Sequence, residues 1–150
     1  MGLSLVKICI HMIFSTLNRV PFINEDIEKR IYDDLRNECA KLDSEVFAVG
    51  GYYDHVHLLC TLPKKIALIK FMEDIKKNTS SSTKTFGSYF EHFYWHDGYT
   101  AVSVCPSKLR KNIQYIENQK DIHRYLSYKD ELKMILEENG LEYDERYLWR

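Results

Sequence analysis

The stretch from residue 46 to residue 62, VFAVGGYYDHVHLLCTL, contains two strand-like segments and decides how the fold is assigned. Val46–Tyr52 predicts one strand, with Gly50 and Gly51 marking a bulge or a turn. His55–Leu62 predicts the next strand, because it is rich in apolar residues and is followed by proline. The two segments are separated by only two residues, so we expect neighbouring strands.

The second of these strands carries two histidines on one face. Successive side chains of a strand point to opposite faces, so His55 and His57 point the same way, with Cα atoms roughly 6.5 to 7 Å apart. Two rings at that separation can converge on one cation. Val56 and Leu58 point the other way and can enter the core. Alone, however, a His-x-His pattern is more often a pair of solvated or hydrogen-bonded histidines than a metal site.

The rest of the chain predicts elements in the order β-α-β-β-α-β, which is the split β-α-β plan of ferredoxin-like domains. Apolar side chains at every second position indicate strands, and apolar side chains at helical spacing indicate helices. Asn24 is a suitable N-cap for the first helix. The other predicted elements are a strand over residues 6–14, a helix from about 25 to 42, a helix over 66–77, a polar loop over 79–83, a short helix over 86–93, a strand over 99–104, and a final helix between Ser127 and Gly140.

The predicted fold class is therefore α+β, with an antiparallel sheet whose two crossover helices cover one face. A third helix, entering near Pro106 and Ser107, follows the last strand and is free to lie across the opposite face. If Val56 faces the crossover helices, His55 and His57 face this third helix. The topology therefore predicts that the histidines lie next to the functional side chains of the third helix.

Two polar residues on the third helix are candidates for that chemistry. Tyr115 and Gln119 are four residues apart, and residues at that spacing lie one above the other on a helix face. Without the histidines, a half-buried tyrosine and an ordinary exposed glutamine would be the better interpretation. With them, the set contains two imidazoles, one amide oxygen and one potential nucleophile.

With these residues in these positions, the chain resembles a known family, the single-tyrosine HUH transposases of small bacterial insertion sequences (IS200-like) and their REP-associated relatives. The resemblance covers nearly the whole chain. Members commonly have two adjacent histidines shortly after the glutamine, whereas this chain has Ile122 and His123. The matching segments are residues 11–16 (HMIFST), 55–57 (HVH), 76–82 (KKNTSSS), 95–104 (WHDGYTAVSV), 115–119 (YIENQ) and 143–149 (YDERYLW).

The resemblance implies a metal-dependent transposase that cleaves and rejoins single-stranded DNA. It implies that His55, His57 and Gln119 hold a divalent metal, and that Tyr115 attacks DNA to form a 5′-phosphotyrosine with a free 3′-OH. Two imidazoles and an amide oxygen leave coordination positions open, which suits Mg²⁺ or Mn²⁺ better than structural zinc. Tyrosine has a pKa of about 10, so the phenol needs help to ionise, and no base is evident from the sequence.

Length and composition agree with one folded domain over residues 1–150. Hydrophobic residues make up 45% of the chain and charged residues 29%, an ordinary globular balance. The apolar run over residues 3–14 is too short for a bilayer span or a convincing signal peptide, so we expect a cytoplasmic protein without membrane contact. The cysteines show no metal-binding or disulfide spacing, and we expect small core residues at Cys9, Cys39, Cys60 and Cys105.

The net charge of −1 is an argument against nucleic-acid binding, because phosphate contacts need lysine and arginine. The local distribution is more favourable, since basic residues gather before the short helix and at the start of the third helix, while acidic residues concentrate at 25–34 and 130–145. For any single lysine, a solvated helix face is the alternative interpretation. The candidate DNA-binding residues are Lys76, Lys77, Lys84, Lys108, Arg110 and Lys111.

The expected partners are single-stranded DNA, at hairpin ends of an insertion sequence, and a second copy of the chain. Excision needs two cuts and each chain offers one candidate nucleophile at the right position, so a homodimer is expected. The resemblance implies that histidines and tyrosine can come from different subunits. The alternatives are a host-retained nuclease that processes palindromic repeats, and a non-catalytic ferredoxin-like nucleic-acid-binding module.

Overall fold

A computed structural model of the chain describes residues 2–150 and contains one four-stranded sheet. The strands are β1 (Cys9–Ser15), β2 (Val46–Tyr52), β3 (His55–Thr61) and β4 (Thr100–Ser103). Their order across the sheet is β2-β3-β1-β4, and every neighbouring pair is antiparallel. This is the strand order and the α+β class expected for the split β-α-β plan.

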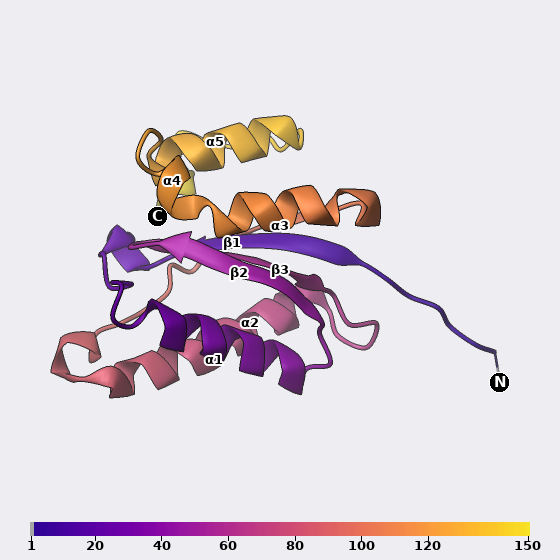
Figure 1. The fold of residues 1–150 in the computed structure, drawn as a ribbon, viewed down its shortest axis with the longest axis horizontal. Coiled ribbons are helices and arrows are strands. Elements are labelled where there is room, and N and C mark those ends of the chain that lie inside the picture. Colours follow the sequence, from indigo (N-terminus) through magenta and orange to yellow (C-terminus); the bar gives the residue numbers. More distant parts are fainter. Residues whose placement is uncertain (1) are drawn as a thin grey trace.

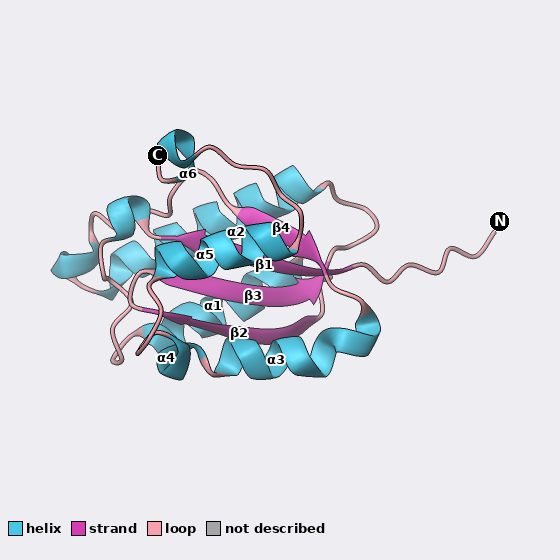
Figure 2. Cartoon of the chain, turned by 90° about the horizontal axis from the view of Figure 1, so that it is seen from above, coloured by secondary structure: helices cyan, strands magenta, loops and turns pink. Residues whose placement is uncertain are grey.

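Helices cover both faces of this sheet (Figure 1). The crossover helices α1 (Glu28–Lys41) and α2 (Leu68–Thr83) lie on one face. The helices α3 (Leu109–Glu117), α4 (Gln119–Ile122) and α5 (Tyr128–Glu138) lie on the other, and a short α6 (Glu145–Leu148) follows. The view in Figure 2 shows α5 running over the middle of the sheet and α3 running along β2.

The alternation along β3 divides the protein into separate apolar clusters. Val56 and Leu58 are fully buried in the main core with residues of α1 and α2, such as Leu35 and Ile75. On the other face, Leu59 packs in a cluster with residues of α3. The predicted orientation is therefore observed, and the face of β3 that carries the histidines is the face that α3 and α5 cover.

Two contacts fix α3 and α5 on that face. Gly50 of β2 lies directly under α3, because a Cβ atom at this glycine would come within 2.3 Å of the carbonyl oxygen of Ile116. The two glycines of β2 therefore allow other backbone segments to approach closely, and they do not form a turn. The register irregularity of this strand lies between Val46 and Ala48, not at the glycines. Ile13 of β1 packs against α5.

The expected cap at Ser127 is confirmed, whereas α1 begins after Ile27 and not directly after Asn24. The side-chain oxygen of Asn24 accepts hydrogen bonds from the backbone N–H groups of Asp26 and Ile27 at 2.9 and 3.2 Å, in the turn that leads into α1. Ser127 accepts a hydrogen bond from the N–H group of Asp130 and caps α5. Gly140 follows α5 with φ of +67°, as a helix-ending glycine should.

Several expectations from the sequence are wrong. Residues 79–83 belong to α2 rather than to a loop, because the hydroxyls of Thr79 and Thr83 donate to the carbonyls of Ile75 and Thr79 and so are satisfied inside the helix. The helix expected over residues 86–93 is absent from the structure described, which has short 3₁₀ helices at Lys84–Phe86 and Ser88–Phe90 instead. Cys105 is exposed, unlike the three buried cysteines. Among the described residues, no helix combines the length and apolar character that crossing a bilayer requires.

Candidate metal centre and tyrosine site

His55 and His57 are fully buried on the face of β3 that α3 and α5 cover. Each ring has one nitrogen held by a neighbour on the sheet side: Nδ1 of His55 lies 2.8 Å from Asp54 Oδ1, and Nδ1 of His57 lies 2.8 Å from His11 Nε2. The other nitrogen, Nε2, of both rings points to one carboxylate. Partners of this kind fix ring orientation in metal-binding histidines.

That carboxylate is Glu131 of α5, which the sequence analysis did not single out. Its side chain is fully buried, and its Oε1 atom lies 3.2 Å from His55 Nε2 and 3.1 Å from His57 Nε2. His123 Nε2 is a third imidazole nitrogen at 3.1 Å from the same oxygen. A signal was present in the sequence: Glu131 falls on the apolar face of α5 with Tyr128 and Leu132, where an unpaired carboxylate would be costly.

Gln119 reaches the same cluster from α4. Its Oε1 lies 3.0 Å from His55 Nε2 and 2.9 Å from His123 Nε2, and its amide nitrogen donates to Glu131 Oε2 at 2.7 Å. The expectation of one continuous helix is wrong, however, because α3 ends at Glu117 and α4 begins at Gln119, after Asn118 leaves helical geometry (φ −97°, ψ 17°). The break does not separate the two predicted side chains.

Tyr115, at the end of α3, donates a hydrogen bond from its hydroxyl to Oε2 of Glu131. Its ring centroid lies 5.9 Å from that of His57. The side chain of Tyr115 is half-buried, whereas Tyr125 is 90% exposed. The four residues singled out on β3 and the third helix therefore lie in one cluster, with Glu131 at its centre.

The electrostatics of the cluster follow from burial and from Glu131. Burial opposes the charge on Glu131, but hydrogen bonds from three histidines outweigh it and hold the pKa of its carboxyl far below the usual range. Burial lowers the pKa of His57, which keeps this ring neutral. Burial also disfavours charge on His55, yet hydrogen bonds to Asp54 and Glu131 raise its pKa. Burial and the adjacent Glu131 raise the pKa of Tyr115.

Residues of this cluster fit a divalent cation. The ligand atoms of His55, His57 and Glu131 all lie within 4.8 Å of one another. The amide oxygen of Gln119 is a fourth candidate ligand, since it lies beside His55 Nε2. A negative carboxylate facing imidazole nitrogens is an arrangement that a cation would stabilise, and a mixed set of imidazole, carboxylate and amide ligands is compatible with Mn²⁺ and Mg²⁺.

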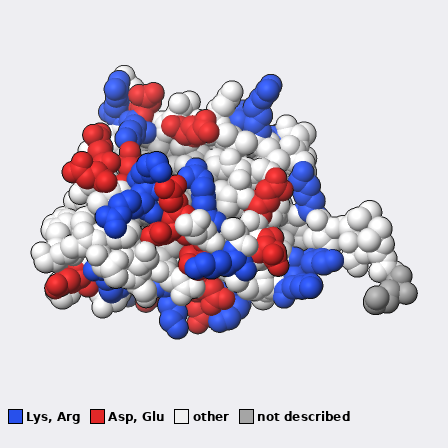
Figure 3. All heavy atoms as spheres, turned by 60° about the horizontal axis from the view of Figure 1, so that its bottom comes forward, with Lys and Arg blue, Asp and Glu red and all other residues white. Residues whose placement is uncertain are grey.

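The predicted DNA-binding residues are not gathered around this cluster. Lys76 is half-buried, and its ammonium donates to the backbone carbonyls of His96 and Asp97, so it anchors the loop before β4. The ammonium of Lys84 lies 3.9 Å from the ring centroid of Tyr94. Figure 3 shows basic and acidic side chains interspersed on the side of the molecule that carries α1 and α2. Exposed positions are found for Lys77 of α2 and for Lys108, Arg110 and Lys111 at the start of α3.

Fold and cluster together define a ferredoxin-like α+β protein with a candidate metal centre beside a tyrosine hydroxyl. The family described as "Transposase IS200 like" matches residues 4–119, which is more than half of the chain. The chain therefore belongs to the IS200-like transposase family, as the resemblance indicated, and this membership supports a transposase function.

Solved structures agree with the fold. A candidate transposase from Deinococcus radiodurans R1 is similar with a TM-score of 0.61 and 22% identity, over 77% of this chain and 93% of that chain. A REP-associated tyrosine transposase bound to a REP hairpin is similar with a TM-score of 0.61 and 14% identity, over 84% of this chain and 74% of that chain. No curated protein sequence shows significant similarity to this chain.

Proposed function

We propose that this protein is a metal-dependent DNA transposase that cleaves and rejoins single-stranded DNA through a 5′-phosphotyrosine on Tyr115. The observation that carries the proposal is the common position of the Tyr115 hydroxyl and the imidazoles of His55 and His57 around one carboxylate. A potential nucleophile therefore lies beside a candidate metal centre, and the chain that contains both belongs to a transposase family.

His55, His57 and Glu131 would hold the metal, with Gln119 as a further ligand. A bound Mg²⁺ or Mn²⁺ would polarise a phosphate oxygen and orient the scissile phosphate. Asp54 completes the arrangement, because it accepts from the second nitrogen of His55. This set differs from the one that the resemblance implies by the addition of a buried carboxylate.

Glu131 also orients the nucleophile, since it accepts the hydrogen bond of the Tyr115 hydroxyl. Its strongly lowered pKa makes it a weak proton acceptor. The carboxylate is therefore better suited to ligating a cation and fixing the phenol than to removing the phenolic proton. The raised pKa of Tyr115 describes the protein without a cation, and a nearby positive charge would favour the phenolate.

The chemical steps balance without an energy source. The Tyr115 hydroxyl gives up its proton to water as its oxygen forms a bond to phosphorus, the bond from phosphorus to the O3′ atom breaks, and the released O3′ takes up a proton. One phosphodiester bond is exchanged for another, so a 3′-OH can reverse the reaction and restore the phenol. Rejoining thus needs no ATP.

A homodimer acting on the hairpin ends of an insertion sequence is the proposed working form. Two strand cuts need two tyrosine nucleophiles, and each chain has one candidate, Tyr115, whose hydroxyl donates to Glu131. A single strand is the proposed substrate rather than a duplex, because unpaired bases can stack on aromatic side chains while basic residues contact the backbone.

A cleavage assay with single strands that carry a short hairpin and a randomised flank tests the proposal. A label at the 3′ end should stay covalently attached to the protein, and a label at the 5′ end should be released on a fragment with a free 3′-OH. Both products should require Mn²⁺ or Mg²⁺ and disappear in excess EDTA. Sequencing the cleaved pool would give the recognised flank.

Tyr115→Phe should abolish the adduct and leave strand binding nearly unchanged, because only the attacking oxygen is lost. Tyr125→Phe is the matched control, since this tyrosine is 90% exposed and should retain full activity. Cleavage in EDTA, or an undiminished adduct in Tyr115→Phe, would refute the mechanism. Binding without any cleavage would favour the non-catalytic module.

A further inference from the structure

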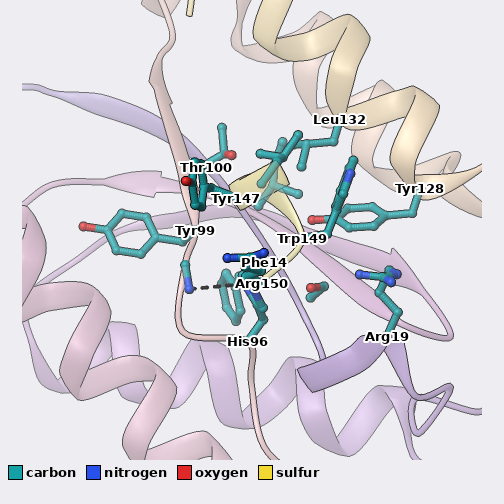
Figure 4. A pocket seen from close by; sticks show the side chains of 14 residues that line it. Phe14, Arg19, His96, Tyr99, Thr100, Tyr128, Leu132, Tyr147, Trp149 and Arg150 are labelled. Atoms are coloured by element: carbon teal, nitrogen blue, oxygen red, sulfur yellow. Dashed lines mark hydrogen bonds between the residues drawn. The ribbon is translucent and has the colours of Figure 1, made fainter. Parts of the chain in front are cut away.

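A pocket of about 220 Å³ opens beside the histidine cluster, between the end of β1, the start of β4 and the segment that contains α6 (Figure 4). Aromatic and basic side chains dominate its walls, and none of its described lining residues is acidic. These aromatic and basic side chains include Arg19, His96, Tyr99, Tyr147, Trp149 and Arg150.

Tyr128 connects this pocket with the candidate metal centre. Its ring lines the pocket and stacks on His55, with centroids 4.2 Å apart and planes inclined by 26°. Ser15 also lines the pocket, and it is the residue paired with His55 between β1 and β3. A molecule in the pocket would therefore lie one aromatic ring away from His55.

The chemistry of the walls suits a nucleotide. Tyr99, Tyr147 and Trp149 supply flat apolar surfaces for a base, while two guanidinium groups can bind phosphate. Arg19 lies 5.8 Å from the ring centroid of Trp149, and Arg150 lies 5.2 Å from that of Tyr147. Each of the two guanidinium groups therefore lies near an aromatic ring on which a base could stack.

His96 adds an unsatisfied donor to the same pocket. Its Nδ1 accepts a hydrogen bond from the backbone N–H of Gly98 at 3.2 Å, so in a neutral ring the proton is on Nε2. This Nε2 is buried and, among the buried side-chain nitrogen and oxygen atoms of residues 2–150, is the one without a hydrogen-bond partner. A ligand that offers an acceptor, such as a phosphate oxygen or a base carbonyl, would satisfy it.

The backbone before the pocket is strained in a way that positions Arg19. Asn18 and Arg19 have φ of +55° and +56°, in the left-handed region that residues with a side chain rarely adopt. Such outliers concentrate at binding and active sites, where the surrounding structure maintains them. Here the strained turn carries one of the two pocket arginines.

We propose that this pocket is a subsite for one nucleotide of the DNA single strand whose scissile phosphate lies at the histidine cluster. The base stacks among Tyr99, Tyr147 and Trp149, and its phosphate binds Arg19 and Arg150. The pocket, at about 220 Å³, is smaller than the roughly 300–1,000 Å³ of sites for drug-sized ligands, so it offers room for the base of one nucleotide rather than for a larger cofactor. The inference rests on the proposed function for its choice of DNA.

Trp149 supplies a direct probe, because the chain contains only two tryptophans and Trp95 is buried in the main core. A 15-residue deoxythymidine strand in EDTA should quench the emission of Trp149 in a saturable way without being cleaved. Anisotropy of a labelled strand measures binding independently. Tyr147→Ala should weaken binding roughly 5- to 100-fold, the effect of losing one base stack, and this residue is 60% exposed, so the fold should survive.

Arg19→Ala and Arg150→Ala should each weaken binding and reduce the slope of log affinity against log salt by about 0.7, the value for one phosphate contact on a single strand. Arg36→Ala removes the same charge from α1, on the other face of the sheet, and should change little. Three results would overturn the subsite. They are equal effects of Arg19→Ala and Arg36→Ala on binding, unchanged Trp149 emission when the strand is bound at saturation, and no binding of the strand at all. Quenching by a strand that is never cleaved with metal would support the subsite and refute the catalytic proposal.

Discussion

The hydroxyl of Tyr115 donates a hydrogen bond to the carboxylate of Glu131, and this contact joins the end of α3 to the first turn of α5 above the histidines of β3. The same carboxylate lies within 3.2 Å of nitrogens of His55, His57 and His123. A buried charge with several partners is costly to disturb, because removing it leaves buried donors without an acceptor. Glu131 therefore connects the proposed nucleophile, the proposed metal ligands and the packing of α5.

Metal binding should be measurable without any DNA. Mn²⁺ should raise the melting temperature of the protein more than Mg²⁺ at equal concentration, because imidazole ligands favour transition metals. Glu131→Gln should weaken Mn²⁺ binding by roughly 100-fold, since a neutral amide replaces the charged ligand. Thermal unfolding at several metal concentrations gives the affinity.

Glu138→Gln is the matched control for this experiment, because Glu138 is an exposed residue at the end of the same helix. It should bind Mn²⁺ as the unaltered protein does. An identical metal-induced shift in Glu131→Gln and Glu138→Gln would exclude Glu131 as a ligand.

Acid should destabilise the metal-free protein through its buried neutral histidines. Burial and the neighbouring His57 lower the pKa of His11 to about 3, from 6.5 in an unfolded chain. Between these values the unfolded state binds a proton that the folded state excludes, so stability falls as the pH decreases through this window. His11→Leu should remove up to about 1.4 kcal/mol per pH unit from that dependence.

Urea unfolding in EDTA at pH 7, 6 and 5 measures the effect of His11→Leu. The comparison concerns the slope against pH, since the variant also loses the hydrogen bond to His57 at every pH. Equal slopes for the two proteins would show that His11 accepts a proton in the folded state at these pH values.

Gly50→Ala should damage the site through the backbone. The added Cβ would lie 2.3 Å from the carbonyl oxygen of Ile116, so α3 must move away from β2. We expect a loss of about 1–3 kcal/mol in stability, the usual cost of overpacking, and a larger proportional loss of cleavage because Tyr115 moves with α3. Gly2→Ala, which meets no atom within 4 Å, is the control, and equal melting temperatures for the two variants would contradict the contact.

Periodicity was sufficient to predict the sheet and the side of β3 that bears the histidines. Strand β2 has the predicted bounds, and β3 differs by one residue, because the alternation of side chains is a local property that tertiary contacts do not change. The helix containing Tyr115 was harder to predict, because it ends at Glu117 and a new helix begins at Gln119. Spacing alone gives no sign of such a break.

Glu131 could not be recognised as a site residue from the sequence as long as charged residues were interpreted as exposed ones. It was included in an acidic stretch over residues 130–145, although it shares a helix face with Tyr128, Leu132 and Ile135. What justifies a carboxylate on that face is the presence of three imidazoles, which come from β3 and from the turn after α4. Only the folded chain brings these segments together.

The last prediction concerns whether one chain supplies a complete site. Tyr115 and His57 of the same chain both contact Glu131, so a site needs no residue from a second subunit in this arrangement. Mixing Tyr115→Phe protein with His57→Ala protein should therefore restore no cleavage, because both sites of a mixed dimer remain defective. If the tyrosine helix is exchanged between subunits, each mixed dimer has one intact site, and about half of the dimers are mixed. Recovered cleavage of up to about half of what a full population of one-site dimers would give would therefore show this exchange. Mixing Tyr115→Phe with unaltered protein controls for dimer formation, and sedimentation at the assay concentration establishes whether the active species is the proposed dimer.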